Sequence, residues 1–278
     1  MPIEFLIFLT VFTPALVGGL NLIFNKNPNV RDTVTLLGAL ITFYFSANIF
    51  LGFDGQATQY KLATIMPGID ISFHIEPLGI VFSLLASGLW ILTHIYAIGY
   101  MRGAKEKNHS RFFFFFSVSI ASVMGISFSG NLFTLFLFYE ILTLITFPLV
   151  SHKGSNEALR GARVYLSILL GTSIGLQLLG IIWIYFSVGT LDFVKGGILN
   201  GSFGSLELTL LVALFAFGIG KAALFPFHRW LPAAMVAPTP VSALLHAVAV
   251  VKAGGVTVLK VGVYICGVAS LSVSGAPE

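Results

Sequence analysis

Eight long apolar stretches constrain the fold of this 278-residue chain more than any other feature of its sequence. The hydrocarbon core of a bilayer is about 30 Å thick, and a helix needs roughly 20 apolar residues to cross it. Suitable stretches lie between polar breaks at residues 3–24, 33–53, 74–99, 112–129, 131–151, 161–188, 206–227 and 238–265. They predict an all-α, multi-pass membrane protein with about eight transmembrane helices. The polar stretches 54–70 and 189–205 are too short for a soluble domain, and we expect surface loops or small amphipathic elements there.

The composition supports a membrane protein and argues against several other classes. Hydrophobic residues make up 56% of the chain and charged residues only 9%, whereas about a quarter of the residues in soluble domains are charged. The single cysteine, Cys266, cannot form an internal disulfide, and no Cys/His cluster suits zinc, haem or an iron–sulfur centre. We therefore expect no cofactor and no metal on this chain, so that any redox chemistry belongs to partner chains. The 15 Lys and Arg residues exceed the 11 Asp and Glu residues only slightly and lie in short loops, which argues against a nucleic-acid partner.

The distribution of basic residues predicts the orientation of the helices. Loops on the cytoplasmic side of a membrane are enriched in Lys and Arg. Such residues follow the first, third and fifth spans, at Lys26, Arg31, Arg102, Lys105, Lys107, Arg111, Lys153, Arg160 and Arg163. This pattern predicts that the N-terminus and, after eight spans, the C-terminus lie outside, in the cell membrane of a bacterium or archaeon. Residues 1–24 lack the basic region and cleavage site of a signal peptide, so we interpret them as the first span.

An acidic residue lies near the middle of the fifth span. Glu140 is nine residues into this stretch, at a depth of about 14 Å along a helix, which is close to the centre of the bilayer. An ionised carboxylate there costs at least a few kcal/mol unless it faces protein or water and has a partner. Glu140 is therefore a functional candidate, and the alternative is a neutral side chain that bridges two helices.

A lysine marks the seventh span as irregular. Lys221 follows two glycines and precedes Pro226 in the stretch FGIGKAALFP. Proline removes a backbone donor and disfavours the helix before it, so we expect this helix to break near the lysine. Broken helices at membrane depth persist where they line a wet cavity or pack within protein, and they are typical of ion sites. The alternative is a structural lysine that extends to the membrane surface.

Two further polar residues lie in the eighth span. His246 and Lys252 follow the turn at Pro238-Thr239-Pro240, which marks the start of this helix. The two side chains need not share a face, but both could border one channel. A histidine in a packed membrane helix is also often only a hydrogen-bonding group between helices, so Lys252 is the stronger candidate.

The combination of one carboxylate and two amines indicates which ion moves. A charged lysine has no lone pair with which to coordinate sodium, whereas a buried lysine can exchange a proton. Our hypothesis is that ionised Glu140 stabilises protonated Lys221, and that weakening this contact releases the proton toward Lys252 and His246. Water chains would have to bridge the gaps between these groups.

The residues around both lysines resemble a known family. The stretches KAALFPFHRWLP at 221–232, APTPVSALLH at 237–246 and VKAG at 251–254 are similar to the signature of antiporter-like membrane subunits. Mrp-type multisubunit cation/proton antiporters, respiratory complex I and membrane-bound hydrogenases share these subunits. A lysine in the VKAG context resembles the Mrp D-type subunit more than those versions of the family that carry a neutral residue there.

The resemblance implies roles for the candidate residues and a division of the chain. Glu140 and Lys221 are implied to be the essential pair, and Lys252 with His246 is implied to continue the proton path. A five-helix repeat over spans four to eight is also implied, so we expect an N-terminal three-helix segment at 1–110 and a proton-translocating repeat at 111–278. The expected partners are other membrane subunits, the lipid bilayer, protons and, as the exchanged cation, sodium.

The sequence departs from the family pattern in its length. Members usually carry a second, inverted repeat, whereas this sequence reaches Glu278 after the first. We expect either one piece of a split subunit, in which a partner chain supplies the second repeat, or a truncated sequence.

Three functions fit these observations. The first is a proton-translocating antiporter subunit, and the second is a proton-pumping membrane-arm subunit of a redox complex of the NADH dehydrogenase or hydrogenase type. The third is a non-conducting scaffold, in which the charged residues only hold helices together. No hydrolytic or redox site is predicted on this chain, so the chain is at most the ion-translocating part of a translocase.

The remaining polar residues receive weaker interpretations. His228, just beyond the predicted break, is either a cytoplasmic proton entrance or an interface anchor beside Trp230. Lys260, two turns beyond Lys252, either extends the path or extends to the membrane surface. Three residues of the third span receive no role, namely His74, Glu76 and His94.

Overall fold

The computed structural model describes residues 3–55, 59–199 and 203–267. In these residues seven helices are long and apolar enough to cross a membrane, and an eighth apolar helix is shorter. Three are unbroken α-helices of the N-terminal part, namely α1 (Ile3–Ile23, continued by η1, Phe24–Lys26), α2 (Pro28–Gly52) and α3 (Pro77–Gly103). The next are α4 (His109–Ser127), α5 (Leu132–Val150) and a long helix made of α6 (Asn156–Thr172), the π-helical turn η2 (Ser173–Gln177) and α7 (Leu178–Val188). The predicted multi-pass helical architecture is confirmed.

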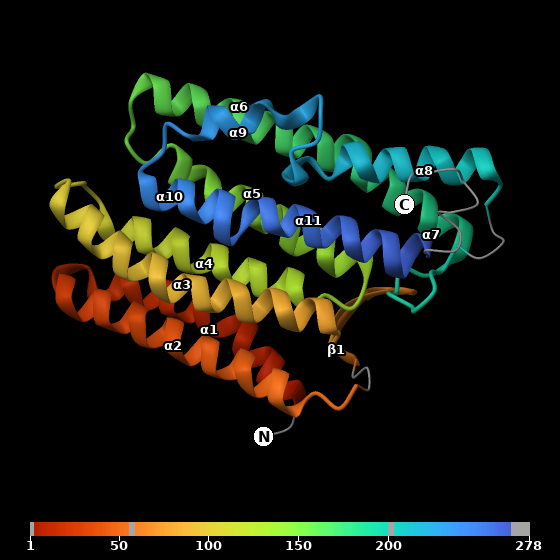
Figure 1. Ribbon diagram of the computed structural model, residues 1–278, viewed down its shortest axis with the longest axis horizontal. Helices are drawn as coiled ribbons and strands as arrows, with labels where there is room; N and C mark the ends of the chain where they lie inside the picture. The colour runs from red at the N-terminus through yellow and green to blue at the C-terminus, as the bar shows by residue number, and fades with distance from the viewer. Residues whose placement is uncertain (1–2, 56–58, 200–202, 268–278) are drawn as a thin grey trace.

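The helices lie side by side along the long axis of the molecule (Figure 1). Helix α1 packs against α2 and α4, α2 packs against α3, and α4 packs against α5. The central position of α4 is reflected in its burial, since 78% of its apolar window is inside the protein. Its phenylalanines Phe112, Phe113 and Phe116 are all buried, so this helix forms the middle of the core.

The seventh predicted span is short and broken. Helix α8 (Ser205–Gly218) is followed by two 3-10 turns, η3 (Gly220–Ala222) and η4 (Phe227–Arg229), and by the five-residue α9 (Trp230–Ala234). The helix therefore ends before Lys221, and Pro226 lies well inside the irregular segment. Close packing explains this position, because a Cβ at Gly218 would overlap the backbone of Gln177 and a Cβ at Gly220 would overlap the Thr172 side chain.

The eighth predicted span is also irregular. It consists of α10 (Thr239–Ala243), the π-helical turn η5 (Leu244–Val248), α11 (Val250–Lys260) and the π-helical turn η6 (Val261–Cys266). Ala249, between η5 and α11, has φ −116° and ψ −75°, which departs from regular helix geometry. π-Helical turns within helices are frequent at functional sites.

A β-hairpin replaces part of the loop predicted at 54–70. Strands β1 (Gln59–Met66) and β2 (Ile69–His74) pair antiparallel around a turn that contains Gly68 with φ +78°. The hairpin is fixed to the start of α5, since Ser72 N donates to Thr134 Oγ1 at 3.0 Å, and to the turn before it, since His74 N donates to Phe128 O at 2.7 Å. It marks one end of the bundle, which we call the hairpin end (Figure 1).

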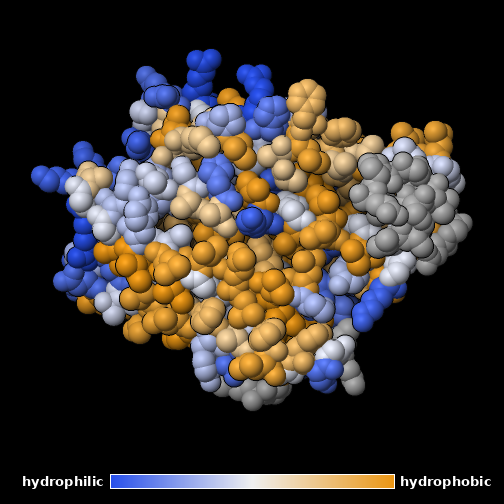
Figure 2. All heavy atoms as spheres, viewed as in Figure 1, coloured by the Kyte–Doolittle hydropathy of each residue, from blue (hydrophilic) through white to orange (hydrophobic). Residues whose placement is uncertain are grey.

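The opposite end carries the basic loops that connect α1 to α2, α3 to α4 and α5 to α6, and we call it the basic end. Figure 2 shows hydrophilic residues gathered toward this end and a broad apolar surface across the middle of the molecule. Large apolar side chains that are exposed in the structure include Leu16, Leu51, Val81, Leu92 and Phe186. Such a surface is suited to lipid or to other membrane chains, and the protein is an integral, multi-pass membrane protein.

Candidate functional site

The broken segment holds Lys221 in the interior. The side chain is fully buried, which excludes the alternative in which it extends to the membrane surface. Its ammonium group donates to the backbone oxygen of Tyr139 at 2.8 Å and to Thr143 Oγ1 at 2.5 Å. The same ammonium lies 3.1 Å from the centre of the Tyr139 ring, a cation–π contact. Lys221 is therefore bound to the middle of α5.

Contacts on several sides hold the turn that carries Lys221. The buried Trp230 donates from its indole nitrogen to Gly220 O at 2.8 Å. The Trp230 ring lies edge-on against Tyr165, with ring centres 5.6 Å apart, and the Tyr165 hydroxyl bonds Thr146 Oγ1 at 2.6 Å. On the other side α11 approaches so closely that a Cβ at Gly254 would overlap the backbone of this turn.

Glu140 lies on α5 next to Tyr139. Both carboxylate oxygens are buried, and neither has a hydrogen-bond partner. Ser173 of η2 is close to the carboxylate, but its hydroxyl donates to Leu169 O at 2.8 Å. Glu140 and Lys221 interact electrostatically, but no direct ion pair within 4.0 Å joins them. The structure thus brings the two residues to one region without a direct bond.

The interior near this region contains other polar atoms that lack protein partners. Both polar atoms of the Gln177 side chain, in η2, are buried without a hydrogen bond, and so is Nε2 of His246, in η5. Buried polar groups in proteins are nearly always hydrogen-bonded to protein or to water. Counting Glu140, three such groups lie on α5, η2 and η5. Ordered water binds buried polar groups of this kind, and a hydrated proton path needs such groups.

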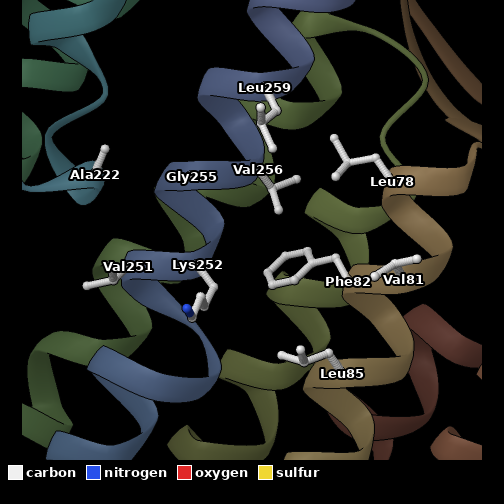
Figure 3. Close-up of a pocket in the computed structure, with 10 residues that line it drawn as sticks. All are labelled: Leu78, Val81, Phe82, Leu85, Ala222, Val251, Lys252, Gly255, Val256 and Leu259. Carbon is white, nitrogen blue, oxygen red and sulfur yellow. The ribbon is translucent and has the colours of Figure 1, made fainter.

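Lys252 lies in a different environment from Lys221. It is exposed, in a groove of about 400 Å³ between α3 and α11. Figure 3 shows its amine among apolar side chains of this groove, including Phe82 and Leu85 of α3. Ala222 lines the same groove, and Gly254 of α11 packs against the backbone of Lys221 and Ala222. Lys252 is therefore exposed in the groove, whereas the Lys221 side chain is buried.

His228 also lies outside the buried region. Its ring is exposed and stacks on Phe225, with ring centres 5.8 Å apart. Pro226, between these two residues in the chain, is exposed as well. This surface position fits either of the roles that the sequence left open for His228.

A second lysine, Lys260, proves to be buried in an ion pair that was not predicted from the sequence. Lys260 is fully buried and forms an ion pair with Glu76, with Nζ 2.7 Å from Oε1. This excludes the interpretation of Lys260 as a residue that extends to the surface. The sequence contained a usable signal, because these opposite charges lie near the same predicted membrane face, in the third and eighth spans.

Comparisons with known proteins agree on one family. Residues 129–273 match the family described as "NADH:quinone oxidoreductase/Mrp antiporter, TM", and residues 66–113 match "NADH-Ubiquinone oxidoreductase (complex I), chain 5 N-terminus".

A Staphylococcus haemolyticus protein named "Putative antiporter subunit mnhA2" is 35% identical over 222 residues, which cover 77% of this chain and 27% of that protein. The chloroplast NAD(P)H-quinone oxidoreductase subunit 5 of Ipomoea purpurea is 32% identical over 265 residues, covering 89% and 37%. A probable K(+)/H(+) antiporter protein of Rhizobium meliloti is 35% identical over 223 residues, covering 78% and 22%.

Solved structures show the same fold. A chain of the archaeal membrane-bound sulfane sulfur reductase superposes with a TM-score of 0.79 at 21% identity, covering 91% of this chain and 40% of its own. A chain of the Mrp complex from Dietzia sp. DQ12-45-1b gives a TM-score of 0.76 at 23% identity, covering 90% and 27%. The chain thus spans well under half the length of these relatives. The staphylococcal relative carries the name mnhA2, so the D-like assignment stays a prediction.

Proposed function

This chain belongs to the NADH:quinone oxidoreductase/Mrp antiporter family of membrane subunits, and from that premise we propose that it translocates protons within a multisubunit cation/proton antiporter. One observation carries the proposal. In a broken helix, a fully buried Lys221 is bonded to α5 beside the unpartnered carboxylate of Glu140. Ionisable groups at this depth in a membrane are kept mainly where they serve transport.

In the proposed mechanism Lys221 holds the proton. Its ammonium has three N–H donors, of which Tyr139 O and Thr143 Oγ1 accept two. The third is free for water or for a carboxylate, and ionised Glu140 is the nearby negative charge that stabilises the protonated lysine. When Glu140 becomes neutral, this stabilisation is lost and one proton leaves Nζ along a hydrogen-bonded water chain. Sodium is the cation we propose for exchange, bound elsewhere in the complex because an ammonium cannot coordinate it.

The continuation of the path involves a second chain. Lys252 is exposed in an apolar groove at membrane depth, where an uncovered ammonium is costly. We propose that other membrane subunits cover this groove, one of them supplying the second repeat, and that His246 and Lys252 pass protons at that interface. In this scheme residues 111–278 form the translocating repeat, His228 borders the cytoplasmic entrance and both termini lie outside. The last described residue is Gly267, so the C-terminal residues of this proposal lie outside the described part of the chain.

A redox-driven complex is the second candidate. The observation in its favour is that one relative is a quinone oxidoreductase subunit with 89% of this chain covered. The residues that move the proton would be the same in either complex. Co-purification of flavin and iron–sulfur chains with this subunit would identify the redox complex, and their absence from an active complex would identify the antiporter.

The test of the proposal is proton flux through the reconstituted complex that contains Glu140→Gln or Lys221→Ala. We expect flux to fall by about 100-fold while all subunits still co-purify, a size typical for removal of a proton-transferring group. Glu157→Gln is the matched control, because Glu157 is exposed in the first turn of α6. Intact flux in an assembled Glu140→Gln complex would refute the proposal. Loss of assembly in this variant would instead support the scaffold function.

A further inference from the structure

The pair of Lys260 and Glu76 lies at the hairpin end of the bundle, apart from Lys221. Glu76 immediately precedes α3, and Lys260 is the last residue of α11. Along α11, Lys260 lies about 12 Å from the level of Lys252, because eight residues separate them. Both side chains are buried, with exposed fractions of 3% for Glu76 and 0% for Lys260. A buried ion pair is costly to desolvate and is therefore weak evidence for a purely stabilising role.

Oxygen atoms surround the Lys260 side-chain nitrogen and favour its charged, ammonium form. Besides Glu76 Oε1, its Nζ lies 3.0 Å from Ser127 O, 3.1 Å from Ser129 O and 3.1 Å from Ser129 Oγ. It also lies 5.3 Å from the centre of the Phe193 ring. An ammonium has only donors, and here each donor has an oxygen to receive it. These oxygens and the Glu76 carboxylate favour the charged form of Lys260, and we assign it a positive charge.

The carboxylate of Glu76 is buried, and neither of its oxygens has a hydrogen-bond partner. Its Oε1 forms the ion pair with Lys260, whereas Oε2 has no cation at contact distance. The residue lines a cavity of about 380 Å³ together with His74, Lys195 and Tyr264. Lys195 is exposed at this cavity, so the cavity lies beside the surface of the hairpin end. The cavity is large enough for several water molecules.

The charged and titratable groups around Glu76 come from several elements. They are His74 of β2, Asp192 and Lys195 of the segment after α7, and Lys260 and Tyr264 of the last helix. Burial lowers the pKa of His74 below its usual value, so at neutral pH this ring is uncharged and can both donate and accept a hydrogen bond. Glu76 is thus a carboxylate with one oxygen in an ion pair with Lys260, in a cavity that it shares with the nearby Tyr264 hydroxyl.

We propose that Glu76 is a proton-exchanging group at the hairpin end of the path, and that Lys260 is its positioning residue. The proposal rests on the proposed function, because it assigns the step between the intramembrane lysines and the aqueous phase at this end. In the step, an O–H bond of a hydronium ion in the cavity breaks and an O–H bond to Glu76 Oε2 forms, which leaves one water molecule and a carboxylic acid. The new O–H bond then breaks, and the proton passes to a water molecule toward the interior or back in the cavity.

The experiment uses proton flux and co-purification of the whole complex with three variants. Glu76→Gln keeps the size of the side chain but removes the exchangeable carboxyl, and we expect flux to fall about tenfold or more. Lys260→Arg keeps a fixed positive charge and should retain flux within about twofold. Glu76→Leu combined with Lys260→Met replaces the pair by apolar groups, which buried sites often tolerate, so assembly should persist while flux is lost. As the control, Lys61→Gln with Asp70→Asn removes an ion pair at the surface of the same end, of exposed Lys61 with half-buried Asp70, and should leave flux unchanged.

The outcomes separate this inference from the proposed function. Normal flux in an assembled Glu76→Leu, Lys260→Met complex would show that the pair is structural and would overturn the inference, while a flux loss in Glu140→Gln would leave the proposed function intact. Loss of flux in an assembled Lys260→Arg complex would make Lys260 the proton carrier and overturn the assignment to Glu76. A readout independent of flux is the infrared carboxyl band that appears on acidification. We expect one such band to be missing in Glu76→Gln, and an unchanged spectrum would contradict the inference even if a variant fails to assemble.

Discussion

The two buried acid–lysine sites of this protein differ in how tightly the charges are joined. At the hairpin end, Lys260 is in direct contact with Glu76 at 2.7 Å and has three further oxygens around it. In the broken segment, Lys221 has two oxygen partners on α5, and neither belongs to Glu140. The first lysine ends a regular stretch of helix, whereas the second lies in a 3-10 turn between helices.

Under the proposed function, we infer from this difference which lysine releases the proton. An ammonium whose donors are all received by fixed oxygens and by a carboxylate at contact distance has little to gain from losing its charge. An ammonium with a free donor, beside a carboxylate that it does not touch, responds to any change in the charge of that carboxylate. We therefore assign a variable charge to Lys221 and a constant charge to Lys260.

The strongest test of this comparison is the same substitution at both lysines. Arginine keeps the positive charge but does not lose its proton in proteins. We expect Lys221→Arg to reduce proton flux by about 100-fold, because the transferable proton is gone. Lys260→Arg should leave flux nearly unchanged. Flux through the reconstituted complex measures both, and co-purification of the other subunits controls for assembly. Equal losses at the two sites would break the distinction drawn here.

The second test concerns the contact by which α11 reaches the turn of Lys221. Gly254 faces this turn, where an added Cβ would overlap backbone atoms, whereas a Cβ at the adjacent Gly255 would meet nothing within 4 Å. Gly254→Ala should therefore destabilise the protein by about 1–3 kcal/mol through overpacking. Gly255→Ala should be neutral or stabilising by up to about 1 kcal/mol, because alanine favours helix.

Thermal unfolding of the purified protein in detergent measures this pair of variants. The expected result is a lower midpoint for Gly254→Ala only. If both substitutions behave alike, the turn of Lys221 does not depend on α11, and the rigidity that distinguishes the two lysine sites has another origin.

The sequence predicted the helices well because each is a long apolar stretch between polar breaks. It also located Glu140 and Lys221 from the cost of charge at membrane depth. It predicted from Pro226 a break near Lys221, and the helix does end at Gly218, where it packs closely against Gln177 and Thr172. Contacts between segments distant in the sequence are not encoded in local residue patterns.

The hairpin and the burial of the pair of Glu76 with Lys260 were missed in the sequence for a related reason. The strands β1 and β2 are short, and their order depends on hydrogen bonds to the turn between α4 and α5. Charge near the end of a span is inexpensive in a membrane, so the sequence indicated no role for Glu76. Only the packing of α3, α4 and α11 shows that this charge is buried.

The third test removes one hydrogen bond near the turn of Lys221 and leaves the Lys260 site unchanged. Tyr165→Phe removes the hydroxyl that bonds Thr146, on the side of Trp230 and the turn of Lys221. Thr146 keeps its bond to Leu142 O at 2.6 Å, so no donor is left unpaired. We expect a loss of about 1 kcal/mol in the free energy of unfolding. Tyr96→Phe, at an exposed position of α3, is the matched control in the same thermal measurement and should show no change.

The smallest expected effect concerns the surface of the hairpin end, close to the fixed pair. Exposed Lys61 and half-buried Asp70 form an ion pair, in which Lys61 lowers the pKa of Asp70 and Asp70 raises the pKa of Lys61. The contribution of Asp70 is present above its usual pKa and is lost as pH falls through its lowered pKa in the folded protein. Surface pairs contribute little and are screened by salt, so Asp70→Asn should leave the unfolding midpoint and proton flux unchanged at neutral pH. A clear drop in flux at neutral pH would mean that the exposed hairpin charges act on Glu76, and the fixed site would then extend to the protein surface.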